Sequence, residues 1–330
     1  MVESHTQPEP MAVLIVAYRR SDNVRKIIEM CLESGITSIY ITIDYPRENS
    51  FDVLSDHDRI KNVITESRAK YQTQIKIYSR IASVNQGSAV SVVSGCDWAL
   101  SNENELVIIE DDCLPNRAFF EFCKLNIRYL DYFENVLLIC GTQFAPKPVV
   151  GNEAVLSKYP LTWGWGTTKT SWSKLRKCFF RDYSSALIAE LMSPLPEIAF
   201  WRAGSRRAIG GFTDVWDTVL VESMLRNKYL AILPPNNLVI NNGNDLVATH
   251  IAQNSPLTNL PVYSEFGNFN LLPVIHKDVE DWIRNNCYKI GKRHFFTTKI
   301  TILRDHLSTK SRRFPLSLGE RLSNKSFSPW

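Results

Sequence analysis

The sequence predicts a doubly wound α/β fold, in which helices cover both faces of a mostly parallel sheet. Short apolar, β-branched segments alternate with helix-like segments as far as residue 141. One of these segments, Leu106–Ile109, is apolar throughout, which is typical of a strand buried on both faces. It ends in three adjacent acids, Glu110, Asp111 and Asp112. Because open α/β sheets bind ligands outside the carboxyl ends of their strands, these acids indicate a ligand site at that edge.

The individual elements follow from apolar runs, helix caps and turn residues. Gly35 ends the first helix, and a polar turn at 18–21 separates that helix from the first strand. The expected strands are 11–17, 38–43, 74–78, 106–109 and 136–141, and the expected helices are about 22–34, 52–70, 85–100 and 116–133.

The regular alternation ends after residue 141. The segment 142–166 is rich in Pro, Gly and Trp and is predicted to be an active-site loop system. Further helices are expected at about 168–178, 184–192 and 217–228, with an irregular Gly/Arg stretch at 201–212 and one or two short strands in 230–240.

Composition limits the class of protein. The 330-residue chain is 44% hydrophobic and 22% charged, as in ordinary globular proteins. Its seven cysteines are scattered without CxxC spacing, which favours reduced thiols in a cytosolic protein over a disulfide framework or a zinc site. The N-terminus shows no signal pattern, and no apolar run is long enough to cross a bilayer. We therefore expect a cytoplasmic protein, with no nucleic-acid partner.

Charge is unevenly distributed along the chain. Residues 289–330 hold ten Lys and Arg against Asp305 and Glu320, so this region carries +8 while the preceding residues carry −4. A basic, aromatic-containing tail could make peripheral contact with an anionic membrane, such as the inner face of the plasma membrane. A solvated terminal extension is the alternative, and the sequence slightly favours it.

The acidic cluster has two interpretations. Three adjacent carboxylates repel one another unless a cation lies among them, and a hard divalent cation bound by one or two carboxylates and a substrate phosphate would supply it. Alternatively, the acids form a loop that caps the helix starting near Asn116.

Arg20 and Asp44 follow the first two strands. At these positions an arginine can contact a base or phosphate, and an acid can accept hydrogen bonds from a base or ribose. Each alone is more often a surface residue. The turn after the first strand lacks GxGxxG, which argues against a dinucleotide cofactor as the ligand.

Three later features could also serve chemistry. Trp163, Gly164, Trp165 and Gly166 combine indole faces suited to a sugar ring with close backbone approach, although a tryptophan-stabilised loop is nearly as good an interpretation. Asp217 starts a helix and is either its N-cap or a carboxylate base beside an indole.

His250 follows a polar, turn-rich segment that begins at Asn241. It is a candidate metal or diphosphate ligand, and a structural histidine is the alternative.

The order LIVAYRRS, ITID, an NQG-led helix, VIIEDDCLPNRAFFEF, WGWG, VWD and a late ATH resembles nucleotide-sugar glycosyltransferases of the GT-A fold. The closest likeness is to the N-acetylglucosaminyltransferase I-like group and its bacterial, family 2-like relatives. It covers about residues 11–252, and its most specific part is the EDD segment, a variant of the DxD motif, followed by Phe119 and Phe120.

This resemblance implies roles for particular residues. Arg20 and Asp44 would contact the nucleotide base, although Arg19 stands where the family usually has an acid, which leaves the choice of arginine open. The other implied roles are: Asn85 in the nucleotide-sugar site, Glu110 and Asp111 on sugar and ribose hydroxyls, Asp112 on Mn²⁺ or Mg²⁺, Trp163 to Gly166 around the sugar, Asp217 as acceptor base and His250 near the diphosphate.

The function expected from this likeness is metal-dependent transfer of a sugar from a nucleoside-diphosphate donor to a hydroxyl of a glycan or lipid-linked acceptor. A GT-A domain would occupy 1–288, with a nucleotide-binding part at 11–141 and an acceptor part at 142–252, and a basic extension would occupy 289–330. A single base, Asp217, is consistent with inverting displacement. A sugar-nucleotide pyrophosphorylase and a non-catalytic carbohydrate- or nucleotide-binding module are the alternatives.

Overall fold

The computed structural model describes residues 11–47, 51–180, 196–210, 213, 215–243, 257, 260–263, 269–290, 300, 321–322 and 327–329. Its strands are β1 (Ala12–Ala17), β2 (Ser38–Ile43), β3 (Lys76–Ala82), β4 (Glu105–Glu110), β5 (Cys113–Pro115), β6 (Val136–Cys140), β7 (Ala154–Ser157), β8 (Trp165–Thr168), β9 (Leu230–Leu233), β10 (Val239–Asn241), β11 (Leu271–Ile275) and β12 (Phe327–Pro329). Its α-helices are α1 (Ser21–Glu33), α2 (Phe51–Tyr71), α3 (Ser88–Ala99), α4 (Arg117–Asn126), α5 (Arg128–Tyr132), α6 (Lys147–Val150), α7 (Lys169–Arg176), α9 (Pro196–Ile209), α10 (Asp217–Asn227) and α11 (Lys277–Trp282), with short helical turns at Lys177–Phe180 and Ile283–Cys287.

The described strands form one large mixed sheet in the order β11-β7-β9-β6-β8-β4-β1-β2-β3-β12, and β5 pairs with β10 in a separate two-stranded sheet. The strands β4, β1, β2 and β3 are mutually parallel, whereas β8 is antiparallel to both of its neighbours. The chain runs from β1 outward to β3 and then returns to the other side of β1 at β4. This reversal creates a switch point between β1 and β4, where doubly wound folds bind ligands.

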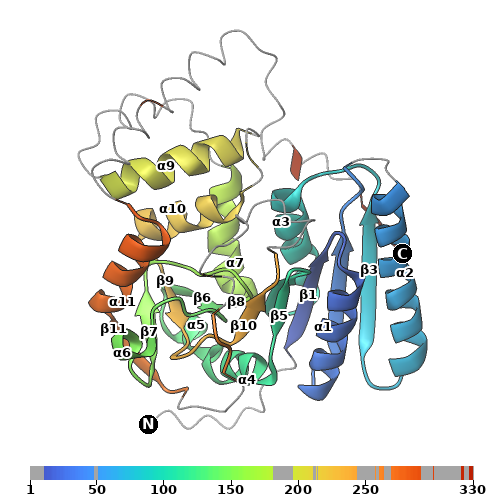
Figure 1. Ribbon diagram of the computed structural model, residues 1–330, viewed down its shortest axis with the longest axis horizontal. Coiled ribbons are helices and arrows are strands. Elements are labelled where there is room, and N and C mark those ends of the chain that lie inside the picture. The colour runs from blue at the N-terminus through green and yellow to red at the C-terminus, as the bar shows by residue number, and fades with distance from the viewer. Residues whose placement is uncertain are drawn as a thin grey trace.

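Helices cover both faces of the sheet, as the sequence predicts (Figure 1). Along β1, Leu14 packs in a core shared with α3, α7 and α10, whereas Val13 and Ile15 pack in a second core with α1, α2 and α4. Successive strand side chains point to opposite faces, so a strand that is apolar throughout is required to serve both cores. The α/β prediction is therefore confirmed.

The structure differs from the expected elements in several places. The single helix expected at about 116–133 is divided into α4 and α5. The segment 142–166 is not wholly irregular, because it contains β7 and the start of β8. The third strand begins at Lys76 and runs on to Ala82. The expected irregular stretch at 201–212 is largely the helix α9, whose Gly204 lies so close to α10 that a Cβ there would be 3.3 Å from Thr218. This glycine permits close helix packing and does not break the helix. The expected helix at 184–192 lies outside the described residues.

The sheet runs through both expected parts of the GT-A domain, and the division at residue 141 stays a prediction. In the part of the chain that the structure describes, no helix has the length and apolar character needed to span a bilayer.

Candidate functional site

A cleft of about 380 Å³ opens at the switch point, over the carboxyl ends of β1, β2 and β4. Its walls come from the turns after these strands, the N-terminus of α3, the WGWG segment, the start of α10 and the end of β10. The lining residues are Val16, Ala17, Tyr18, Arg20, Asp44, Arg47, Asn85, Gly87, Ser88, Ser91, Glu110, Asp111, Asp112, Thr162, Trp163, Val215, Trp216, Asp217, Asn241 and Gly243. The cleft thus collects nearly all of the described residues that the sequence predicts for the site.

Strand alternation sends the first two acids of the cluster to different sides of β4. Ile108 belongs to the core on the α3 and α10 side, and Ile109 to the core on the α1 side. By the same period of two, Glu110 faces α10 and Asp111 faces the β1–α1 turn. These adjacent carboxylates therefore have different partners.

Asp111 accepts hydrogen bonds from the turn that follows β1. Its Oδ2 accepts hydrogen bonds from the backbone N–H groups of Tyr18 (2.6 Å), Arg19 (2.9 Å) and Arg20 (3.1 Å). Its Oδ1 accepts from the Arg20 guanidinium at 3.2 Å, and its backbone oxygen accepts from the Asn23 amide at 2.8 Å. A buried carboxylate with this many donors is a structural anchor for the turn. The expected contact of Asp111 with sugar or ribose hydroxyls stays a prediction, and these bonds limit the oxygen lone pairs available for it.

Asp44 organises the next turn in the same way. Its two carboxylate oxygens accept from the backbone N–H groups of Gln86 and Gly87, each at 2.8 Å, and from the Asn85 side chain at 3.1 Å. The Asn85 amide also donates to the carbonyl of Tyr45 at 2.7 Å. Asp44 and Asn85 line the cleft as a bonded pair, and their contact with a nucleotide stays a prediction.

Glu110 meets other acids across the cleft. Burial, and then the negative charges of Asp112, Asp217 and Asp111, raise the pKa of Glu110 well above its usual value, while a hydrogen bond with the Trp216 side chain opposes that rise. Burial and the charge of Asp111 likewise raise the pKa of Asp112. Carboxylates gathered in a poorly solvated space favour either a proton or a cation among them.

Asp112 is supported by the small β5–β10 sheet. Its Oδ1 accepts from the Cys113 thiol at 3.2 Å, and the Cys113 sulfur accepts in turn from the Asn241 amide at 3.6 Å. The backbone N–H of Asn242 donates to the Asp112 carbonyl at 2.7 Å. These bonds fix both the backbone and the side chain of Asp112 at the edge of the cleft.

The acids of the cleft fit a divalent cation held partly by substrate. Among the described residues, no group of three or more His, Cys, Asp or Glu side chains is arranged to enclose a metal. Mg²⁺ and Mn²⁺ sites that use one or two carboxylates and substrate phosphates need no such group. Asp112, with Glu110 nearby, provides that donor set, and burial together with the neighbouring carboxylates raises the pKa of both carboxyls. His250, the second expected metal ligand, lies outside the described residues.

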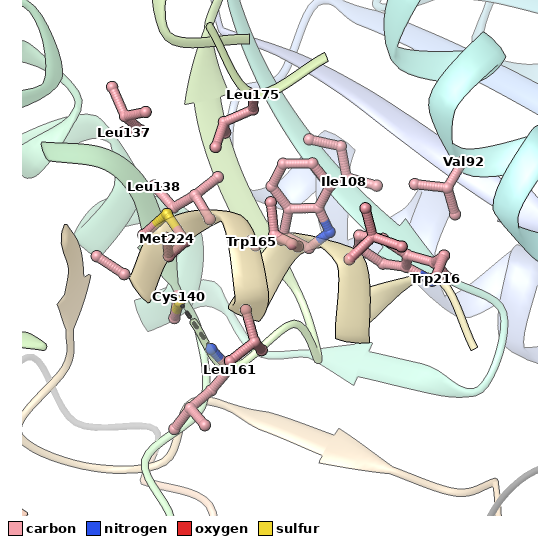
Figure 2. Packing of buried hydrophobic residues seen from close by; sticks show 14 of the residues in the cluster. Val92, Ile108, Leu137, Leu138, Cys140, Leu161, Trp165, Leu175, Trp216 and Met224 are labelled. Carbon is pink, nitrogen blue, oxygen red and sulfur yellow. Dashed lines mark hydrogen bonds between the residues drawn. The ribbon is translucent and has the colours of Figure 1, made fainter. Parts of the chain in front are cut away.

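The WGWG segment divides between the cleft and the core. Trp163 lines the cleft, with its ring edge-on to Phe144 at 5.0 Å. Gly164 has φ of +71°, and a Cβ there would lie 2.9 Å from Val239. Trp165 opens β8 and is fully buried, and Figure 2 shows its indole between Leu138 and Trp216. It is not one of the residues that line the cleft. Trp163 is therefore the indole of this segment that a ligand in the cleft can reach.

The structure also separates the two arginines of the first turn. Arg20 lines the cleft, whereas the Arg19 guanidinium pairs with Asp56 on α2 at 2.7 Å.

Asp217 is the first residue of α10. The N-cap position is held by Trp216, which makes no side-chain capping bond, so the capping alternative for Asp217 is wrong. Asp217 instead lines the cleft opposite Glu110.

Several cleft residues were missed from the sequence. Tyr18 and Arg47 are joined by a hydrogen bond from the Arg47 backbone N–H to the Tyr18 hydroxyl at 3.0 Å, across two turns that only the fold brings together. Ser88 and Ser91 carried a usable signal, since residues three apart at the start of a helix share a face.

No protein-family model matches the chain, and no curated protein matches it in sequence. Among solved structures, the chain is similar to one described as "The Crystal Structure of UDP-glucose pyrophosphorylase complexed with UDP-glucose", with 10% sequence identity and a TM-score of 0.34. The similarity covers 68% of this chain and 89% of that chain. A likeness this weak carries no argument for function, which rests instead on the cleft.

Proposed function

We propose that the protein is a metal-dependent glycosyltransferase that moves a sugar from a nucleoside-diphosphate donor to a hydroxyl of a glycan or lipid-linked acceptor. The observation that supports this most is the convergence of Glu110, Asp112 and Asp217 in one cleft at the switch point of the sheet. In this reaction the diphosphate that leaves the donor needs positive charge, and the acceptor hydroxyl that attacks the sugar needs a base. The cleft offers a group for each requirement.

Asp112, assisted by Glu110, would hold Mn²⁺ or Mg²⁺ against the diphosphate. When bound, such an ion neutralises charge on the departing diphosphate. The protein's own contribution is to hold the Asp112 carboxylate in place through Cys113 and the β5–β10 sheet. Arg20, which is paired with Asp111, adds positive charge to the cleft lining.

Asp217 would take the proton from the acceptor hydroxyl as the hydroxyl attacks. It is half-buried at the start of α10, beside the Trp216 indole that hydrogen-bonds Glu110. A general base placed like this typically contributes about 10²–10⁴-fold to the rate. Trp163 provides a flat apolar face for the transferred sugar. One base and no second carboxylate assigned as nucleophile lead to inversion at the anomeric carbon, which anomeric analysis of the product would test.

A sugar-nucleotide pyrophosphorylase is the main alternative. Such an enzyme normally uses the turn after its first strand to bind phosphates, and here the N–H groups of Tyr18, Arg19 and Arg20 already donate to Asp111. This arrangement favours the transferase. A binding module that performs no chemistry would not require Asp217.

The products formed from a panel of nucleotide sugars would discriminate these functions. With Mn²⁺ and hydroxyl acceptors or water, a transferase releases nucleoside diphosphate, whereas a pyrophosphorylase supplied with pyrophosphate releases nucleoside triphosphate. We expect diphosphate release, reduced about 10²–10⁴-fold in Asp217→Asn with donor binding retained. Asp58→Asn, a change of an exposed acid on α2, is the matched control. Triphosphate release, or turnover unchanged in Asp217→Asn, would contradict the proposal.

A glycan or lipid-linked acceptor, a cytoplasmic location and a peripheral contact with a membrane remain predictions.

A further inference from the structure

Two described pieces of the basic C-terminal region contact the half of the fold that contains β1 to β4. The strand β12 pairs antiparallel with the last three residues of β3, Arg80 to Ala82. Leu322 is buried in the core that also contains Val90 and Val93 of α3. These described pieces are thus part of the folded domain, at the end of β3 where the chain turns toward Asn85 and the cleft.

Arg321 makes the contact nearest to the cleft. Its Nη1 donates to the backbone oxygen of Gln86 at 3.2 Å, across 235 positions of sequence. The Nε and Nη2 atoms of Arg321 are buried and have no other hydrogen-bond partner among the described residues. A guanidinium held in this way is costly to bury, so its placement at Gln86 calls for a reason beyond general packing.

The Gln86–Gly87 peptide group explains that placement. Arg321 contacts the oxygen of this peptide, and the N–H of the same peptide, which belongs to Gly87, donates to Asp44 at 2.8 Å. Gly87 has φ of +81°, in a region that glycine enters freely, so this peptide has an accessible flipped alternative. A flip would turn the Gln86 oxygen toward the Asp44 carboxylate, and Asp44 would lose the hydrogen bond from the Gly87 N–H. A cation at the oxygen opposes the flip and polarises the N–H that binds Asp44.

We propose that Arg321 is a positioning residue of the cleft, which locks the Gln86–Gly87 peptide in the orientation that holds Asp44 and Asn85. The C-terminal region is then a structural component of the donor site, and neither a solvated extension nor a membrane anchor describes this part of it. The effect on the peptide stands by itself, whereas its effect on donor binding rests on the proposed function.

Hydrogen exchange at the Gly87 amide tests the lock directly, because that N–H is the one bonded to Asp44. The test variant is Arg321→Met, which keeps the apolar stem and removes the donors. Arg321→Lys restores one donor and the charge. Arg284→Ala removes an arginine that is paired with Asp281 on the α11 side of the fold and serves as the control.

We expect exchange at Gly87 to be about tenfold faster in Arg321→Met, which corresponds to about 1.4 kcal/mol, to be largely restored in Arg321→Lys and to be unchanged in Arg284→Ala. Nucleoside diphosphate titrated into the same proteins should bind up to about tenfold more weakly to Arg321→Met. Unchanged Gly87 exchange, or faster exchange spread over the whole protein, would overturn the proposal.

Two further outcomes remain decisive. If Arg321→Met does not fold, Arg321→Gln takes its place, because it removes the guanidinium and keeps a polar side chain at this position. The Gly87 amide should then exchange faster, and an unchanged rate would overturn the proposal. If the wild-type protein binds no nucleoside diphosphate, the proposed function fails, and Gly87 exchange still decides whether Arg321 positions the peptide.

Discussion

Two regions of the same cleft use carboxylates in opposite ways. On the wall formed by the turns after β1 and β2, Asp111 and Asp44 accept hydrogen bonds from backbone N–H groups and bind the loops to the sheet. On the floor between β4 and α10, the buried Glu110 is subject to the negative charges of Asp112 and Asp217. The acids of the wall are hydrogen-bonded within the protein, whereas the acids of the floor would be stabilised by a bound cation.

This difference distinguishes carboxylates that stabilise the folded loops from carboxylates that are available to a ligand. A carboxylate surrounded by N–H donors stabilises the folded chain and has limited capacity for a ligand. A carboxylate surrounded by other carboxylates destabilises the folded chain and gains when a cation or a proton arrives. Substitutions on the wall should therefore reduce stability, and substitutions on the floor should remove binding and turnover at little cost in stability.

The largest expected effect on stability is at Asp111. Asp111→Ala leaves three backbone N–H groups and the Arg20 guanidinium without their acceptor, and should lower the free energy of unfolding by about 3–5 kcal/mol. Urea denaturation followed by circular dichroism measures this. A loss no larger than that of Asp58→Ala on the exposed face of α2 would show that the wall is not anchored by Asp111.

A smaller loss is expected at Asp44. Asp44→Ala removes the acceptor of the Gln86 and Gly87 N–H groups and should cost about 1–3 kcal/mol, because buried donors are left unsatisfied. The same denaturation experiment gives the value. The Gly87 amide should lose protection against hydrogen exchange at the same time, and retained protection would mean that another group holds this turn.

The smallest effect, and one of opposite sign, is expected on the floor. The pKa of Glu110 is raised in the fold by burial and by its acidic neighbours, so its contribution to stability is fully present below the unfolded value near 4.5 and is lost as pH rises through the folded value. Glu110→Gln should therefore match the wild type at pH 4.5 and exceed it in stability by about 1 kcal/mol or more at neutral pH without divalent cations.

Denaturation of both proteins from pH 4.5 to 8 in the presence of a chelator measures that difference. Adding Mn²⁺ should reduce it, since the ion would stabilise the ionised wild-type floor. A stability difference that does not change with pH would contradict the assignment of Glu110 to the repulsive region.

The sequence predicted the position of the cleft because apolar strand patterns show where each strand ends, and the residues after those ends lie at one edge of the sheet. The run Leu106–Ile109 marks a central strand, and parallel strands bring Arg20, Asp44 and Glu110 to one edge. Which acid faces which element follows from alternation only when the neighbouring helices are known. The hydrogen bonds that backbone N–H groups donate to Asp44 and Asp111 could not be predicted from the sequence, because the donors lie in turns about 42 and 92 positions away.

Composition misled at two elements. Glycine and tryptophan suggested loop throughout 163–166, yet Trp165 pairs in β8 between β4 and β6 and its side chain fills the core. Gly204 suggested an irregular segment, yet it permits α9 to pack closely on α10. In both cases a contact distant in sequence overrides the local preference of the residue.

The central claim is that the floor of the cleft binds a nucleoside diphosphate together with a divalent cation. Calorimetric titration with a panel of nucleoside diphosphates, with and without Mn²⁺, tests it in the wild type, Asp112→Asn and Asp58→Asn. We predict Mn²⁺-dependent binding of one nucleotide that is lost in Asp112→Asn and kept in Asp58→Asn, with all three proteins equally folded. Absence of nucleotide binding by the folded wild-type protein, or binding that ignores both Mn²⁺ and Asp112, would contradict the account.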